Sequence, residues 1–301
     1  MARVRIGYGL RWESYATMAT AVRDYKFRQV DVFGARAQAG NPVAVVQEAE
    51  GLNDEAMAAF ARWTNLSETT FLLPPTRPEA DYRLRIFTPG GELPFAGHPT
   101  LGSAHAWLEA GGQPQQGARL VQECGVGLVT LRRSEAGLAF CAPPLLREGP
   151  LEPELVAELT AALGLEPRQV VAHQWVDNGP GWCALLLASA EEVLAVKPDM
   201  QALGDHRLGL IGPWRGKDRG ADFEVRAFVP GLGVPEDPVT GSLNAGLAQW
   251  MIQSGRAPQQ YRASQGRALG RDGLIQVAQE DQRVWIGGRC VSVIEGRVAF
   301  P

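Results

Sequence analysis

The chain has 301 residues, of which 45% are hydrophobic and 21% are charged, a composition typical of a soluble globular protein with room for two domains. Acidic residues outnumber basic ones by 33 to 29, and no basic patch is visible, so a nucleic-acid partner is not expected. The longest apolar run, 182–190, is too short to cross a bilayer, so we expect a cytoplasmic protein without membrane contact.

Local patterns predict the elements of the first half. Alternating apolar residues indicate strands, and apolar residues at helical spacing behind a capping Asn or Asp indicate helices. In chain order we expect a strand at 26–33, a turn at Gly40-Asn41-Pro42, a short strand at 43–46, a helix from Asn53 or Asp54 to about Trp63, strands at 66–73 and 81–88, and a helix from about Thr100 to Glu109.

The second half starts after Pro143-Pro144, in a stretch rich in Pro and Glu. We expect a helix at 153–163 ended by Gly164, strands around 169–176, 182–188 and 223–229, a helix from about Gly241 to Gln253, and three short strands in the last thirty residues.

These elements predict two domains, at 24–143 and 144–301, after an N-terminal extension at 1–23. The last strand is left free to cross back to the first domain. Because Met18 stands just before the first strand, our hypothesis is that translation starts there and that residues 1–17 are an extension.

An internal repeat is the most informative feature of the sequence. When the chain is shifted by 141 residues, 81–107 lies over 222–248, and both copies carry a strand, a Pro-Gly turn and a helix. The identical pairs are Asp81/Asp222, Arg85/Arg226, Phe87/Phe228, Pro89/Pro230, Gly90/Gly231, Pro94/Pro235 and Ala104/Ala245. We interpret the copies as duplicated domains, although two independent strand-turn-helix units would share some of this turn chemistry.

The repeat also predicts a site between the two domains. Each copy ends in a small-residue turn that opens a helix, at 95–100 and at 236–242. Free backbone N–H groups at a helix start attract anions, and glycine lets a ligand approach closely. Hydroxyl donors are added by Thr100, Thr240 and Ser242. Two such helix starts facing one cleft are suited to hold a small carboxylate substrate.

Four sequence blocks together resemble the PhzF family of phenazine-biosynthesis proteins. They are Gly40-Asn41-Pro42, SETTF at 67–71, FTPGGELPFAGHPT at 87–100 and EDPVTGS at 236–242, and their order and spacing also match. The resemblance extends over roughly residues 27–300. It implies an α+β fold like that of diaminopimelate epimerase, with two pseudo-symmetric duplicated domains, each a mostly antiparallel, barrel-like sheet around a central helix.

The resemblance also implies an activity and its residues. In that family a proton leaves carbon and another is delivered elsewhere on a ring, without a metal or an organic cofactor. The implied catalytic residues are Glu68, which shuttles the proton, His98 and Asp237. The substrate-binding candidates are Gly97, Gly241, Ser242 and Asn41, the last of which could instead shape its turn. A homodimer is the expected assembly, and a small carboxylate the expected ligand.

These residue types suit proton transfer. Burial in a closed cleft raises the pKa of a carboxyl group, and a second carboxylate nearby raises it further, so Glu68 beside Asp237 could act as acid or base near neutral pH. His98 could donate a hydrogen bond or relay a proton. The sequence leaves the order of these roles open, and it names neither the substrate nor a pathway.

The sequence disfavours metal and thiol chemistry. Its four Cys and four His are scattered and contain no CxxC pair, so a zinc site is not expected. Epimerases of this fold use two Cys, but the matching turn positions under the 141-residue shift are Ala96 and Asp237. Two alternatives remain: an epimerase or racemase with carboxylate bases, and a ligand-binding or scaffold protein without catalysis.

Overall fold

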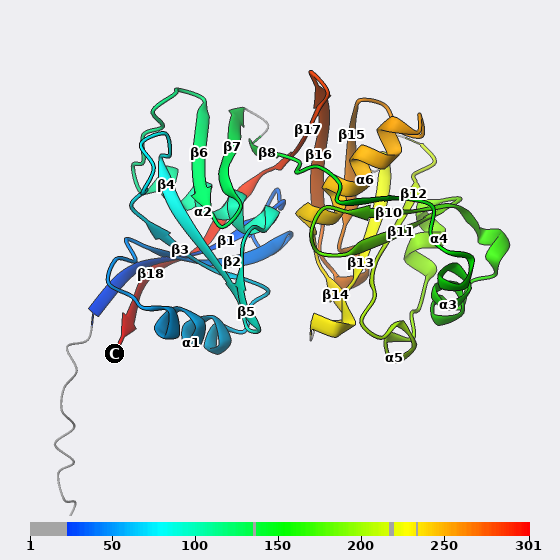
Figure 1. Cartoon of the computed structure of the whole chain (residues 1–301), viewed down its shortest axis with the longest axis horizontal. Coiled ribbons are helices and arrows are strands. Elements are labelled where there is room, and N and C mark those ends of the chain that lie inside the picture. The colour runs from blue at the N-terminus through cyan, green and yellow to red at the C-terminus, as the bar shows by residue number, and fades with distance from the viewer. Residues whose placement is uncertain (1–22, 135–136, 217–219, 233) are drawn as a thin grey trace, which may run out of the picture.

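The computed structural model describes residues 23–134, 137–216, 220–232 and 234–301, which form two side-by-side halves (Figure 1). The start at Met18 lies outside the described residues. The first half contains β1 (Arg23–Val32), β2 (Asn41–Gln47), α1 (Asp54–Thr64), β3 (Thr69–Leu73), β4 (Tyr82–Thr88), β5 (Gly91–Leu93), α2 (Gly97–Glu109), β6 (Arg119–Cys124), β7 (Gly127–Ser134) and β8 (Gly137–Cys141).

The second half begins at β9, and its last strand returns to the first half. In order its elements are β9 (Arg147–Gly149), α3 (Pro153–Leu163), β10 (Val170–Asp177), β11 (Trp182–Leu187), α4 (Ala190–Ala195), α5 (Met200–Leu203), β12 (Arg207–Pro213), β13 (Phe223–Phe228), β14 (Glu236–Asp237), α6 (Gly241–Gln253), β15 (Gln260–Gln265), β16 (Gly273–Glu280), β17 (Arg283–Gly288) and β18 (Cys290–Phe300).

The two halves share one strand plan, as duplication requires. In the first, β2 runs parallel to β3, β4 pairs antiparallel with β3 and parallel with β6, and β6, β7 and β8 form a meander. In the second, β11, β12, β13 and β15 repeat these pairings, and β15, β16 and β17 form the meander. Each sheet curves around a buried helix, α2 or α6 (Figure 1). The α+β, epimerase-like architecture expected from the sequence is therefore confirmed.

Two strand pairings join the halves. β8 pairs antiparallel with β17, and β18 crosses back to pair with β1 along its whole length, from Cys290 opposite Val32 to Phe300 opposite Arg23. The sheet of the first half therefore includes the last strand of the chain. The predicted division at 143–144 stays a prediction.

The repeat has two offsets rather than one. The offset of 141 is right for β4 and β13, where Asp81 and Asp222 each accept a hydrogen bond from the parallel strand that follows α2 or α6. After the turn the offset becomes 144: the helices begin at Gly97 and Gly241, and both are 13 residues long. The extra residues lie in the turn after Gly231. The pairs Pro94/Pro235 and Ala104/Ala245 were therefore wrong.

Most helices lie where the sequence predicts them. α3 and α6 have the predicted bounds, and Gly164 ends α3 in a left-handed conformation with φ 67°. α2 starts at Gly97 rather than near Thr100, because Pro99 fits the first turn of a helix, where its missing N–H has no partner to lose. The strands that were not predicted are β5, β6, β7, β8, β9, β12, β14 and β15, and the short helices α4 and α5 were not predicted either.

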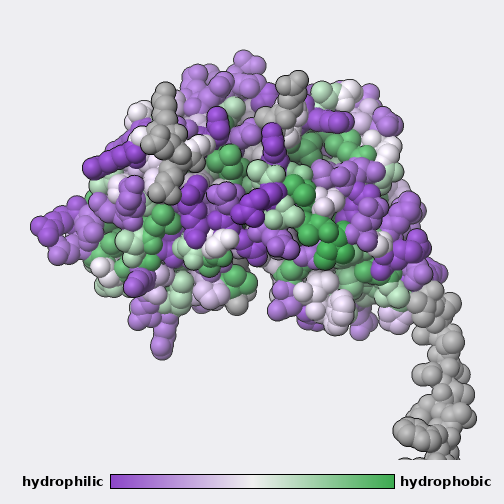
Figure 2. All heavy atoms as spheres, turned by 180° about the vertical axis from the view of Figure 1, so that it is seen from behind, coloured by the Kyte–Doolittle hydropathy of each residue, from purple (hydrophilic) through white to green (hydrophobic). Residues whose placement is uncertain are grey.

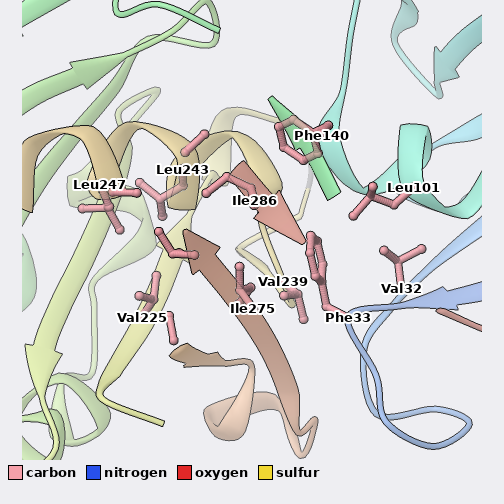
Figure 3. Close-up of a cluster of buried hydrophobic side chains, with 14 of the residues drawn as sticks. Val32, Phe33, Leu101, Phe140, Val225, Val239, Leu243, Leu247, Ile275 and Ile286 are labelled. Carbon is pink, nitrogen blue, oxygen red and sulfur yellow. The ribbon is translucent and has the colours of Figure 1, made fainter. Parts of the chain in front are cut away.

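One apolar core runs through both halves. Val32 and Leu101 of the first half and Leu243 and Ile275 of the second are all 0% exposed and belong to the same cluster (Figure 3). Continuous packing of this kind stabilises both halves together, because interior side chains resist displacement. This core packs against α2 and α6, whose N-terminal ends carry the predicted site.

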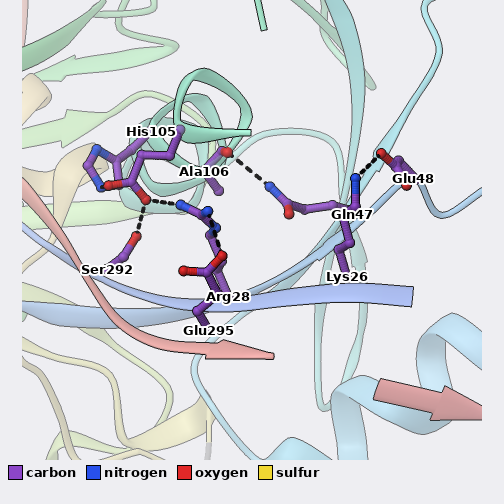
Figure 4. A network of polar contacts seen from close by, with 9 residues as sticks. Lys26, Arg28, Gln47, Glu48, His105, Ala106, Ser292 and Glu295 are labelled. Atoms are coloured by element: carbon purple, nitrogen blue, oxygen red, sulfur yellow. Dashed lines mark hydrogen bonds and ion pairs between the residues drawn. The ribbon is translucent and has the colours of Figure 1, made fainter. Parts of the chain in front are cut away.

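Polar contacts fix the returning strand against α2 (Figure 4). Arg28 of β1 donates to Glu109 at the end of α2, and to Glu295 of β18 at 3.0 Å. The hydroxyl of Ser292 donates to Glu109 at 2.5 Å. The network ties β1, β18 and α2 to one another, and so it positions the helix whose other end carries His98.

The surface shows no strong segregation on the side in Figure 2, where hydrophilic side chains alternate with smaller hydrophobic areas, and the outline is indented at the lower edge between the halves. No helix in the described part of the chain is long and apolar enough to cross a membrane.

Helix α1 offers a test of the fold at its N-cap. The side chain of Asn53 accepts a hydrogen bond from the backbone N–H of Ala56. We expect Asn53→Ala to lower the free energy of unfolding by about 1 kcal/mol, because this N–H loses its partner. Urea denaturation measures the change, and Asn53→Asp, which keeps an acceptor, is the control. Equal stability of Asn53→Ala and the parent protein would show that this cap contributes nothing.

Candidate active site

Glu68 stands immediately before β3, where the chain enters the sheet beside β2. Its backbone carbonyl accepts from the N–H of Ala44, and its side chain is 15% exposed. Oε2 lies 3.2 Å from Nε2 of His98, but neither atom has a hydrogen-bond partner among the described residues. Buried polar atoms without partners are uncommon in folded proteins and are concentrated at functional positions.

His98 is the second residue of α2, and its side chain is 4% exposed. The N-cap residue, Ala96, makes no side-chain hydrogen bond to the first turn, so the first backbone N–H groups are uncapped by it. Burial lowers the pKa of His98 to about 3, although a hydrogen bond with the Pro42 backbone opposes the shift. The imidazole is therefore neutral at physiological pH and acts through hydrogen bonding.

Asp237 comes from the other half, at the end of β14. Oδ1 accepts from the amide of Asn41 at 2.9 Å, and Oδ2 accepts from the hydroxyl of Thr240 at 2.6 Å. Its backbone carbonyl accepts from Gln265 on β15. Both oxygens of this carboxyl group are thus held by donors, in contrast to Oε2 of Glu68.

The two carboxyl groups have raised and different pKa values. Burial raises the pKa of Glu68 to about 8, and the negative charge of Asp237 adds to the shift. Burial also raises the pKa of Asp237, but the donors Thr240 and Asn41 oppose this and leave it at about 6. Between these values the pair holds one proton, on Glu68, which can give it up or take it back at little cost.

The two helix starts meet at their glycines. A Cβ atom added to Gly241 would lie 3.1 Å from Cα of Gly97 and 3.2 Å from the backbone N of His98. A Cβ atom on Gly97 would lie 2.7 Å from the ring of Phe140. Neither helix has a side-chain cap, so both present free N–H groups at this junction. The expected convergence of the helix starts is thus observed.

Ser242 occupies the position in α6 that His98 occupies in α2. The indole N–H of Trp182 donates to its hydroxyl oxygen at 3.0 Å, and the amide of Asn178 donates to its carbonyl at 2.9 Å. Sequence reasoning missed both partners. Trp182 belongs to the apolar core, at 3% exposure, but its indole N–H reaches Ser242. A Trp on a buried strand carries no signal of this in the sequence.

The structure therefore brings the candidates of both halves together. Glu68, His98 and Asn41 come from the first half, and Asp237 and Ser242 from the second. In the described part of the chain, no group of three or more His, Cys, Asp and Glu side chains is placed to hold a metal ion.

Comparisons with known proteins agree with this fold. The family model PhzC-PhzF, described as phenazine biosynthesis-like protein, matches residues 30–296. Antisense-enhancing sequence 1 of Schizosaccharomyces pombe is 35% identical over 294 residues, covering 91% of this chain and 98% of that protein. Trans-2,3-dihydro-3-hydroxyanthranilate isomerase of Pseudomonas aeruginosa is 34% identical over 285 residues, covering 91% of this chain and 99% of the relative.

Solved structures give the same result. A crystal structure of a PhzF-family phenazine biosynthesis protein from Enterococcus faecalis is 27% identical, with a TM-score of 0.76, and covers 92% of this chain and 99% of its own. A hydroxyproline epimerase from Agrobacterium vitis, at 14% identity and a TM-score of 0.52 over 92% of this chain and 93% of its own, shares the fold alone. From the family match over nearly the whole chain and the duplicated epimerase-like fold, we conclude that this protein belongs to the PhzC-PhzF family of isomerases.

Proposed function

We propose that this protein shifts a proton on a small, cyclic or amino-acid-like carboxylate, with Glu68 as the acid and base. The observation that carries the proposal is Oε2 of Glu68, a buried atom without a hydrogen-bond partner in the described structure, which lies 3.2 Å from neutral His98 and is near enough to Asp237 for its charge to raise the pKa of Glu68. Donors hold both oxygens of Asp237, whereas Oε2 of Glu68 is free to exchange a proton with carbon.

The reaction needs no electron acceptor. The carboxylate form of Glu68 takes a proton from an sp³ carbon next to a conjugated system, and the C–H electrons shift along that system. The carboxylic acid so formed delivers the proton to a second carbon, and the double bond has moved. The Glu68 side chain is 15% exposed, so the proton that it holds can exchange with solvent before it is delivered.

The helix starts bind and orient the substrate. The free N–H groups at Gly97 and Gly241 and the hydroxyl of Ser242 are suited to a substrate carboxylate. Because the Ser242 oxygen already accepts from Trp182, its O–H remains available to donate. His98, being neutral, orients Glu68 or a polar group of the substrate.

Trans-2,3-dihydro-3-hydroxyanthranilate is the first substrate to try, because it names the reaction of a relative at 34% identity. Loss of its diene absorbance on adding the protein, absent with Glu68→Gln, supports the proposal. An amino acid racemised by the protein would instead support an epimerase with two carboxyl groups. The homodimer and the cytoplasmic location remain predictions.

The pair of carboxyl groups predicts a pH dependence. Because the ionised carboxylate of Glu68 takes the first proton, kcat/KM rises as the pH approaches about 8 and levels off above it. We expect Asp237→Asn to move this rise to lower pH, because the negative charge that helps to raise the pKa of Glu68 is lost. A kcat/KM that falls above pH 8 would show instead that protonated Glu68 is the working form of the free enzyme.

A further inference from the structure

Asn41 uses both hydrogens of its amide group across the boundary between the halves. Nδ2 donates to Oδ1 of Asp237 at 2.9 Å and to the carbonyl of Val239 at 2.9 Å. Both partners can only accept, so they fix which end of the amide is nitrogen. Asn41 itself is 0% exposed, and Nδ2 also lies 3.4 Å from Nδ1 of His98. No amide hydrogen is left for a substrate.

Hydrogen bonds to the side chain of Asp31 fix the turn that carries Asn41. Oδ2 of Asp31 accepts from the backbone N–H groups of Ala39 and Gly40, at 2.9 and 2.8 Å. Gly40 has no space for a side chain, because a Cβ atom there would lie 2.0 Å from the carbonyl oxygen of Val32. Arg271 of the second half donates to the carbonyl of Gly40 at 3.3 Å. The turn is therefore built to place one side chain accurately.

We propose that Asn41 is a positioning residue: a latch that joins the two halves by binding Asp237 and Val239 and thereby sets the Asp237 carboxylate against Glu68. This differs from the substrate contact that the sequence suggested for Asn41. It rests on the proposed function only in taking Glu68 and Asp237 as the acid–base pair.

The latch has an electrostatic consequence. Glu68 and Glu236 are the negative groups that face Asp237, while His98 is neutral and Glu236 is neutralised by two hydrogen bonds from Arg226. The amide of Asn41 is one of two donors that keep Asp237 ionised beside a protonated Glu68. Removing this donor makes Asp237 easier to protonate, and a neutral Asp237 no longer helps to raise the pKa of Glu68.

Hydrogen exchange on the ligand-free protein tests the latch directly. In Asn41→Leu, which keeps most of the volume but has no donor, we expect amide exchange in α2 and α6, from the hydrogen-bonded N–H groups of Thr100 and Asn244 onward, to be faster by roughly thirtyfold, since two hydrogen bonds are lost. Asn178→Leu is the matched control. It removes an asparagine from the same cleft whose partner, Ser242, lies in its own half, so the exchange of α2 stays unchanged.

Asn41→Asp adds a second measurement, a pH dependence that would be absent if Asn41 only filled space. A protonated Asp at position 41 can donate to Asp237, whereas an ionised one repels it. We therefore expect the protection of α2 and α6, corrected for the intrinsic pH dependence of amide exchange, to recover as the pH is lowered, with Asp31, Glu68, His98 and Asp237 as the titratable neighbours. This variant also serves if Asn41→Leu fails to fold.

The outcomes separate the latch from the proposed function. Exchange in α2 and α6 that is unchanged in Asn41→Leu, or protection in Asn41→Asp that does not recover at low pH, overturns the latch while leaving the role of Glu68 intact. Faster exchange together with no turnover of any substrate by the parent protein overturns the isomerase proposal and leaves the latch standing.

Discussion

Glu68→Gln is expected to lower kcat by about a thousandfold, because the amide can neither take the proton from carbon nor return it. The variant keeps the shape of the side chain, so KM changes little. The measurement is the initial rate with the best substrate found for the parent protein. Glu55→Gln, at an exposed position in the first turn of α1, is the matched control and keeps full activity. A Glu68→Gln variant with more than a tenth of the parent activity would exclude Glu68 as the acid–base group.

The same substitution is expected to stabilise the fold at alkaline pH. The pKa of Glu68 is about 8 in the folded protein against an ordinary value of 4.5, so between these values the folded state binds more protons than the unfolded state. Stability from this group is therefore full below pH 4.5 and declines as the pH rises to about 8, by a few kcal/mol. Glu68→Gln removes that decline. Denaturation of both proteins at pH 5 and pH 8.5 measures it.

Gly241→Ala is expected to lower kcat/KM by roughly tenfold, since a displacement of about 1 Å costs a hundredfold and the added methyl group shifts its neighbours by less than that. The added methyl group would stand 3.1 Å from Cα of Gly97 and 3.2 Å from the backbone N of His98, and neither backbone has room to yield without moving a helix start. The added methyl group pushes the two helix starts apart and so changes the angle between the halves. We therefore expect activity to fall more than stability.

Gly296→Ala is the control for that substitution, because a Cβ atom at Gly296 in β18 would meet nothing within 4 Å and its backbone suits any residue. We expect it to keep the parent activity and melting temperature. Equal activity of Gly241→Ala and Gly296→Ala would show that contact between the two helix starts is unimportant for catalysis.

The strand-turn-helix units could be read from the sequence because local chemistry specifies them. Asn53 caps α1, Gly164 ends α3, and alternation marks β4 and β13. The repeat predicted two similar halves and the meeting of their helix starts. The extra residues in the turn after Gly231 escaped detection because turn length is set by backbone geometry, which a fixed offset does not register.

The partners within the site could not be predicted, because they depend on packing between distant segments. Trp182 and Asn178 contact Ser242 although they lie 60 and 64 positions before it in the sequence. Neither residue lies in a recognisable motif. Asn41 stood in a motif, but only the structure shows that its amide is spent on Asp237 and Val239. The differing pKa values of Glu68 and Asp237 likewise depend on which donors surround each group.

Deuterium uptake from solvent tests the central claim most directly. The parent protein and Glu68→Gln are incubated in D2O with cyclic dienes that bear a carboxylate, among them trans-2,3-dihydro-3-hydroxyanthranilate, and with common amino acids, and NMR locates each new C–D bond. The account predicts deuterium on a ring carbon of a diene, with the parent protein only. Uptake that persists in Glu68→Gln, or that occurs only at the α-carbon of an amino acid, would contradict it.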